Sequence, residues 1–268
     1  MKNKIKILVW QFALVLGLYS SHVQAQFVAP YIDIIEFNSD IDYRRSFDID
    51  HNDVILVDPL FSISSNVTPA TISSVRGAVV DGYHKDASGL KHFSFDVDTT
   101  VNGVSILKSD IMRCADANCL SPQLVFDSEI NNIIHININA FTFDPANGEL
   151  IFSIDSNAVI AGNTYLSSDI IRFDGTDFTV EYGPFADVFL LHNNIDGLSM
   201  IAADRFLVSF ANNSKRNDIY QLNTTTQTWS LAYTPFNDDN FYNHINVSSL
   251  MVQTQAVPEL LFSDSFED

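Results

Sequence analysis

Four residues with oxygen-bearing side chains recur at similar intervals along the chain. They are Asp81, Asn139, Asp196 and Asn246, and successive members are 58, 57 and 50 residues apart. Each follows Val or Ile and precedes a small residue at the start of a run rich in strand-forming residues. If those runs lie side by side, the carboxylate and amide oxygens could bind a hard cation such as Ca²⁺. The alternative is that they make ordinary turn hydrogen bonds where strands begin.

Three histidines accompany this set. His135, His192 and His244 stand four, four and two residues before the second, third and fourth members. Three imidazoles from neighbouring strands could bind Zn²⁺, and they are equally compatible with loop residues packed on aromatic side chains.

A second set of acidic residues also recurs, and its recurrence favours a structural role. A catalytic carboxylate would be expected once, whereas a carboxylate that fixes a turn by accepting backbone N–H bonds can appear in every copy of a repeat. These acids are Asp96, Asp155, Asp110, Asp169 and Asp218.

Cys114 and Cys119 are the two cysteines of the chain. Their short separation and an oxidising compartment predict a local disulfide, which would pin one hairpin and contribute about 2 kcal/mol.

The elements that must position these residues are predicted to be strands. Apolar and polar residues alternate over short runs, as in His92–Val97 and Phe178–Tyr182, and turn-forming residues separate the runs. The 21 phenylalanines suit a core packed between sheets. We therefore expect an all-β fold.

An internal repeat further limits the all-β folds that fit the sequence. Residues 89–113 and 148–172 align without a gap, and 10 of the 25 positions are identical. Shared residues include Ser94/Ser153 and Gly103/Gly162, and a shorter copy follows from Arg205. Units of 50 to 58 residues have room for four short strands, which is the size of a propeller blade.

The two ends of the domain also resemble parts of the repeat. Residues 33–37 resemble 169–173, and residues 259–263 resemble 149–153. We expect the N-terminal strands to complete the blade that begins at Ile245, which would remove exposed sheet edges. Residues 47–61 would start an extra blade. The prediction is a small β-propeller of about five blades, or four if residues 41–79 form a cap or insertion. A β-sandwich or a β-solenoid is the alternative.

The N-terminus predicts export. Lys2, Lys4 and Lys6 precede an apolar stretch from Ile7 to Tyr19, and Val23-Gln24-Ala25 has the small residues of a cleavage site. We expect a signal peptide over residues 1–25, a repeat domain over 26–258, and a closing strand or tail over 259–268. No later segment is apolar enough to span a bilayer. The expected location is periplasmic, secreted or at the surface of a bacterial cell.

The net negative charge of the chain limits the kinds of partner that it could bind. Beyond the three lysines of the signal peptide, 33 acidic residues face 11 basic ones. This balance repels phosphate backbones, so nucleic acid is not expected as a partner.

The repeat resembles one found in many bacterial exported proteins of undefined activity. The motif G-x-L-x-F-S-x-D, followed by D-I-x-R-F, stands at residues 148–173. The segment Phe262–Glu267 is similar to an F-x-D-G-F-E tail of exported proteins, with Ser265 in place of Gly. The resemblance implies a propeller-like exported domain and assigns no catalytic residue.

The function expected from the sequence is a non-catalytic binding or surface-interaction module whose ligand is unknown. No cofactor is required, although Ca²⁺ could occupy the first set of residues. The alternative is a propeller hydrolase or lyase that acts on sugars or lactones, with a cation in its central channel.

Overall fold

The computed structural model describes residues 34–39, 43–44, 48–49, 54–58, 62–66, 68–75, 77–183, 194–211, 218–233 and 247–253. The predicted signal peptide (1–25), the segment 259–268, Asn246, His192 and His244 lie outside these residues.

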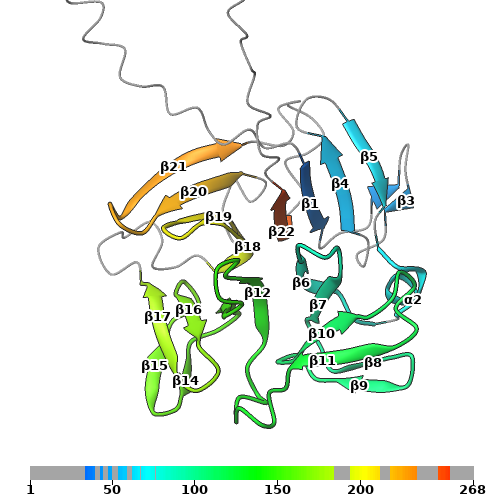
Figure 1. Ribbon diagram of the computed structural model, residues 1–268, viewed down its shortest axis with the longest axis horizontal. Helices are drawn as coiled ribbons and strands as arrows, with labels where there is room; N and C mark the ends of the chain where they lie inside the picture. Colours follow the sequence, from blue (N-terminus) through cyan, green and yellow to red (C-terminus); the bar gives the residue numbers. More distant parts are fainter. Residues whose placement is uncertain are drawn as a thin grey trace, which may run out of the picture. The chain divides into compact units, whose positions relative to one another are not determined.

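The described residues form four antiparallel sheets, and each contains the four strands that the length of the repeat unit predicts (Figure 1). Blade 1 contains β6 (Val80–Lys85), β7 (Lys91–Phe95), β10 (Ile111–Cys114) and β11 (Pro122–Phe126). Blade 2 contains β12 (Ile138–Phe143), β13 (Leu150–Ile154), β16 (Ile170–Phe173) and β17 (Phe178–Tyr182). Blade 3 contains β18 (Ile195–Ala202), β19 (Arg205–Phe210), β20 (Ile219–Asn223) and β21 (Thr228–Tyr233).

The closing blade joins the two ends of the domain. Its strands are β22 (Val247–Gln253), β1 (Ile34–Ser39), β4 (Val54–Asp58) and β5 (Ser62–Asn66), in that order. Ile34 lies opposite Gln253 and Phe37 lies opposite Leu250 in the ladder between β1 and β22. The predicted pairing of the chain's end segments is confirmed.

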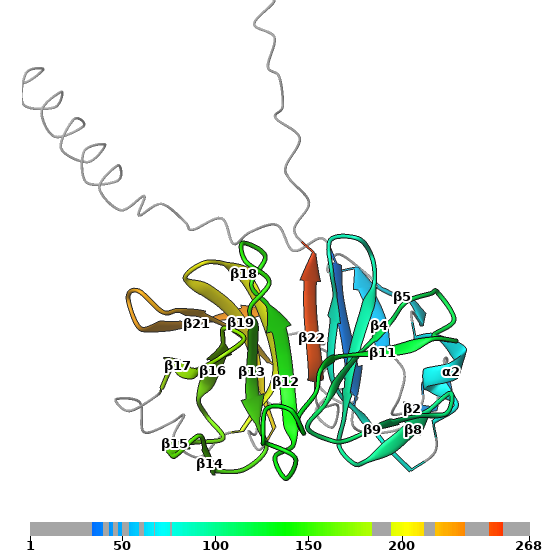
Figure 2. The ribbon, with the colours of Figure 1, turned by 60° about the horizontal axis from the view of Figure 1, so that its bottom comes forward.

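The first strands of the blades form a closed circle of contacts. β6 contacts β12, β12 contacts β18, β18 contacts β22, and β22 contacts β6. In Figure 2, β22 stands between β12 and the strands of its own blade. Radial sheets whose first strands meet in a circle define a β-propeller, so the fold class is confirmed.

The expected assignment of the N-terminal strands was wrong in two respects. The sequence matched residues 33–37 to 169–173, the segment that contains the third strand of blade 2, but β1 is a second strand because it pairs directly with the inner strand β22 and with β4. Residues 47–61 start no extra blade, since β4 and β5 complete the closing sheet. The described residues therefore contain four blades, the lower of the two counts.

A small hairpin separates the second and third strands in three of the blades. The hairpins are β2 (Tyr43–Arg44) with β3 (Asp48–Ile49), β8 (Thr99–Val101) with β9 (Val104–Ile106), and β14 (Ala158–Ile160) with β15 (Asn163–Tyr165). The turns Asn102-Gly103 and Ala161-Gly162 have positive φ at both residues, which explains why the repeat carries Gly there. A short helix, α2 (Ala70–Ser73), precedes blade 1.

Aromatic side chains fill the space between neighbouring blades. Phe126 of blade 1 meets Phe173 of blade 2 with ring centroids 5.5 Å apart, and Tyr182 of blade 2 meets Trp229 of blade 3 at 5.7 Å. This packing agrees with the abundance of phenylalanine. Within the described ranges, no helix has the length and apolar character needed to cross a bilayer.

Candidate functional site at the start of the inner strands

Three of the four recurring oxygen-bearing residues occupy the same irregular position in their blades. The β6–β7 ladder pairs Val80 with Phe95 and then Gly82 with Ser94, so Asp81 is an extra residue without a partner across the ladder. Asn139 of β12 and Asp196 of β18 are skipped in the same way. A β-bulge bends the strand and re-aims the extra side chain, so the three bulges present equivalent side chains from three blades.

Close packing requires the small residue that follows each bulge. A Cβ atom added at Gly82 would lie 2.5 Å from both Cδ1 of Phe141 and Oγ of Ser94. Blade 2 carries Ala140 at the equivalent position. The inner strand of blade 1 therefore approaches blade 2 closely enough to exclude a side chain.

Hydrogen bonds connect the bulges of successive blades. Nδ2 of Asn137 donates to Oδ2 of Asp81 at 2.7 Å, from blade 2 to blade 1. Nδ2 of Asn139 donates to the backbone oxygen of Ile195 at 2.5 Å and lies 3.3 Å from Oδ1 of Asp196, from blade 2 to blade 3. The predicted site residues Asp81, Asn139 and Asp196 thus share one end of the ring of inner strands, and Asn246 lies outside the described residues.

This end of the ring is acidic. Burial raises the pKa of Asp81 well above its ordinary value, and the negative charges of Asp196, Asp96 and Asp155 raise it further. The hydrogen bond from Asn137 acts in the opposite direction and does not cancel the effect. A site with this balance favours a bound positive charge or a shared proton.

The recurring serines also act at the bulges, although the sequence did not indicate their role. Oγ of Ser94 donates to the backbone oxygen of Ile138, and Oγ of Ser153 donates to that of Ile195, both at 3.2 Å. Each serine lies on the second strand of one blade and holds the start of the next blade's inner strand.

Two of the recurring acids, Asp110 and Asp169, fix turns as predicted, and the same role for Asp155 and Asp218 stays a prediction. Oδ2 of Asp110 accepts a bond from the backbone N–H of Leu107 at 2.9 Å, and Oδ2 of Asp169 accepts the equivalent bond from Leu166 at 2.8 Å. Asp96 accepts a bond from the N–H of Val79 at 2.6 Å.

The repeated arginine is also structural in blade 2. Arg172 of β16 lies within 3 Å of carboxylate oxygens of Asp144, Glu149 and Glu181, so one guanidinium connects the β12–β13 loop to β17.

A histidine pair that the sequence analysis did not single out lies toward the other end of β6. The rings of His84 and His92 are 5.8 Å apart, and each lies 5.2 Å from the ring of Phe143. Burial, reinforced by His92, lowers the pKa of His84 to about 4. Both imidazole rings pack against the ring of Phe143, and only the cross-strand pairing of His84 with His92 could have indicated them.

The predicted histidine set is not assembled in the described residues. His135 is exposed in the loop before β12, and its two counterparts lie outside the description. No group of three or more His, Cys, Asp or Glu side chains suited to a metal ion occurs among the described residues.

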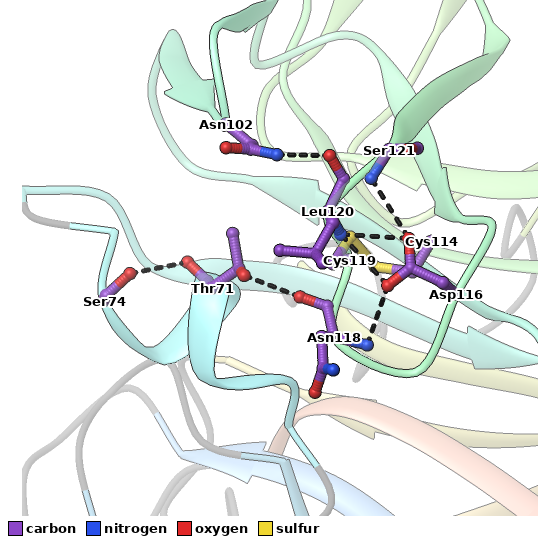
Figure 3. The surroundings of a disulfide bond; sticks show 9 residues. All are labelled: Thr71, Ser74, Asn102, Cys114, Asp116, Asn118, Cys119, Leu120 and Ser121. Atoms are coloured by element: carbon purple, nitrogen blue, oxygen red, sulfur yellow. Dashed lines mark hydrogen bonds between the residues drawn. A yellow bond between two sulfur atoms is a disulfide. The ribbon is translucent and has the colours of Figure 1, made fainter.

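The predicted disulfide is present and joins Cys114 to Cys119 (Figure 3). Inside its loop, Asp116 accepts hydrogen bonds from the backbone N–H groups of Asn118 and Leu120. Oγ1 of Thr71 donates to the backbone oxygen of Asn118 at 2.6 Å, and the side chain of Asn102 donates to that of Leu120. The bridge thus holds the β10–β11 turn against α2 and against the β8–β9 turn, away from the bulges.

Comparisons with known proteins give distant structural similarities only. No family model matches the chain, and no curated protein matches it. The extracellular domain of a hybrid two-component system from B. thetaiotaomicron is 12% identical with a TM-score of 0.31, over 74% of this chain and 23% of that one. Virginiamycin B lyase from Staphylococcus aureus, in a catalytically inactive form with quinupristin, is 15% identical with a TM-score of 0.31, over 74% and 55%. AztD from Citrobacter koseri is 8% identical with a TM-score of 0.28, over 75% and 45%.

The chain spans between about a quarter and about half of the length of these proteins. Because the TM-scores are near 0.3, the assignment as a propeller depends on the strand pairing and contacts within this chain.

Proposed function

We propose that this chain is an exported β-propeller that acts as a non-catalytic binding module, and that its ligand binds at the bulged ends of the inner strands. The observation that carries the proposal is the set of bulges that bring Asp81, Asn139 and Asp196 together from three blades. A bulge interrupts the ladder hydrogen bonds, and its repeated use at one end of the ring supports a binding role for the residues that it re-aims.

The carboxylates and amides at the bulged ends of the inner strands indicate which class of ligand could bind there. Two carboxylates that repel one another, Asp81 and Asp196, stand among amide side chains of Asn137 and Asn139. A ligand that carries positive charge, or several N–H or O–H donors, would offset this repulsion. The proposed partner is therefore a cation or a ligand with a cationic group.

Export is part of the proposal. The N-terminal pattern of lysines, apolar residues and a small-residue cleavage site supports it, and so does the disulfide, since such bonds persist in oxidising compartments. Sequencing the N-terminus of protein recovered from outside the cytoplasm should find Gln26 first. Recovery of the uncleaved chain in the cytoplasm would contradict export.

A binding assay with a matched charge control tests the function. Tetralysine and a neutral oligosaccharide serve as probes in calorimetry with the purified protein. We expect tetralysine to bind and its affinity to fall at least about tenfold in Asp196→Asn. Asp177→Asn removes the same charge from an exposed turn and should leave the affinity unchanged. Equal binding by the two variants would contradict the proposal.

One observation favours the alternative function, a hydrolase or lyase that acts on sugars or lactones. A carboxyl group with a raised pKa beside a second carboxylate is the arrangement of a general acid. Turnover of a lactone or an oligosaccharide that is lost in Asp81→Asn would replace the binding function with a catalytic one.

A further inference from the structure

Two asparagines at equivalent positions of blades 2 and 3 donate hydrogen bonds to different kinds of acceptor. Asn194 precedes Asp196 by two residues, and its Nδ2 donates to the backbone oxygen of Asp155 at 2.7 Å. Asn137 precedes Asn139 by two residues, but its Nδ2 donates to the carboxylate of Asp81 instead. Asn137 therefore bonds to a side-chain carboxylate where Asn194 bonds to a backbone oxygen, and this difference occurs at the acidic end of the ring.

The amide oxygen of Asn137 has no hydrogen-bond partner. The residue is only 6% exposed, and Oδ1 is buried without a donor among the described residues. Exchanging the oxygen and nitrogen would place the amide oxygen against the carboxylate of Asp81, so the orientation is fixed by that bond. The unpartnered Oδ1 and the Nδ2 that donates to Asp81 therefore belong to the same amide group of Asn137. Such an atom is costly unless it meets a donor or a cation.

The negative charge of Asp81, like the oxygen of Asn137, would be stabilised by a bound cation. Asp81 is half-buried, and both its partial removal from water and the nearby carboxylate of Asp196 disfavour its ionised form. A divalent cation would offset both effects and would also meet the unpartnered oxygen. Oxygen-only ligands from carboxylates and amides suit a hard cation, and Ca²⁺ accepts irregular arrangements of such ligands more readily than Mg²⁺ does.

We propose that Asp81 and Oδ1 of Asn137 bind a Ca²⁺ ion at the start of the inner strands, with Asp196 supplying the second negative charge. This inference rests on the proposed function, because it names the ligand of the same site. The ion would connect blades 1, 2 and 3, since the three residues belong to different blades.

Calorimetry and thermal unfolding of the chelator-treated protein test the inference, with Ca²⁺ itself as the probe. We expect a dissociation constant on the order of 10⁻⁴ to 10⁻³ M, as in extracellular Ca²⁺ modules. At a Ca²⁺ concentration ten times that constant, the melting temperature should rise by roughly 3–5 °C.

Three variants assign the site. Asp81→Asn should lower the Ca²⁺ affinity at least about tenfold. It should fold, because Asn139 occupies the same bulge position in blade 2. Asn137→Ala should also weaken Ca²⁺ binding. Asn194→Ala is its matched control, since it removes the equivalent side chain and should leave the Ca²⁺ affinity unchanged.

Two outcomes would overturn the inference: no response to Ca²⁺, or Ca²⁺ binding that Asp81→Asn does not alter. If Ca²⁺ fails to bind while tetralysine binding still depends on Asp196, the inference fails and the proposed function stands. If neither probe depends on Asp196, both fail.

Discussion

Ser153 on the second strand of blade 2 donates a hydrogen bond of 3.2 Å to the backbone oxygen of Ile195, where the inner strand of blade 3 begins. Ser94 makes the same bond to Ile138, one blade earlier. The sequence repeat thus contains the contact that places each bulge relative to the preceding blade.

Ser153→Ala should lower the free energy of unfolding by about 1 kcal/mol, because a buried hydrogen bond between blades is lost. Denaturant titration measures the change. Ser156→Ala is the control, since Ser156 is exposed and its hydroxyl donates to the carboxylate of its neighbour Asp155. Equal midpoints for the two variants would show that the bond between blades contributes nothing.

Gly82→Ala should destabilise the protein by about 1–3 kcal/mol, because the added methyl group would overlap Phe141 and Ser94. The reverse change in blade 2, Ala140→Gly, adds no atom and should cost only about 1 kcal/mol through backbone freedom. Thermal unfolding of both variants provides the comparison. A neutral Gly82→Ala would mean that the blades lie further apart than described.

Loss of the disulfide should destabilise the protein modestly without abolishing the fold. The closed loop between Cys114 and Cys119 is short, so Cys114→Ser/Cys119→Ser should cost about 2 kcal/mol. This corresponds to a fall of roughly 4–8 °C in melting temperature for a domain of this size. A loss of all β signal in the circular dichroism spectrum would contradict the local role of the bridge.

Acidification should destabilise the protein through His84. Its folded-state pKa, about 4, lies below the ordinary histidine value, so the unfolded chain binds the proton first. The stabilisation from neutral His84 is present near pH 7 and is lost as pH falls from about 6.5 to about 4. The lowered pKa sets an upper bound of about 3 kcal/mol on this loss.

His84→Leu should reduce the dependence of stability on pH in that window. His135→Leu changes an exposed histidine and should leave it intact. Melting temperatures between pH 7 and pH 4 test the prediction, which fails if both variants keep the wild-type pH profile.

The repeat made the blade architecture predictable because identical residues perform identical structural tasks. Asp110 and Asp169 fix the same turn, and Gly103 and Gly162 occupy the same left-handed position. The pairing of the chain ends was also predictable. The assignment within the closing blade was not predictable, because the segments 33–37 and 169–173 share residues while β1 and β16 hold different positions in their sheets.

The candidate site was only partly predictable. The recurrence of Asp81, Asn139 and Asp196 indicated equivalent places, but a bulge arises from ladder register, which a sequence pattern does not specify. Asn137 was not singled out, because its partner Asp81 lies 56 residues away in another blade. The contact of His84 and His92 with Phe143 likewise required the packing of blade 1 against blade 2.

The bulges bring the carboxylates of blades 1 and 3 into one site, and the pKa of Asp81 reports on the presence of the second carboxylate. Carboxyl-carbon NMR of the metal-free protein should give Asp81 a pKa well above the ordinary value. In Asp196→Asn the pKa should fall towards that value, while Asp177→Asn should not change it. An ordinary pKa for Asp81 that does not respond to Asp196→Asn would show that the two carboxylates do not share a site.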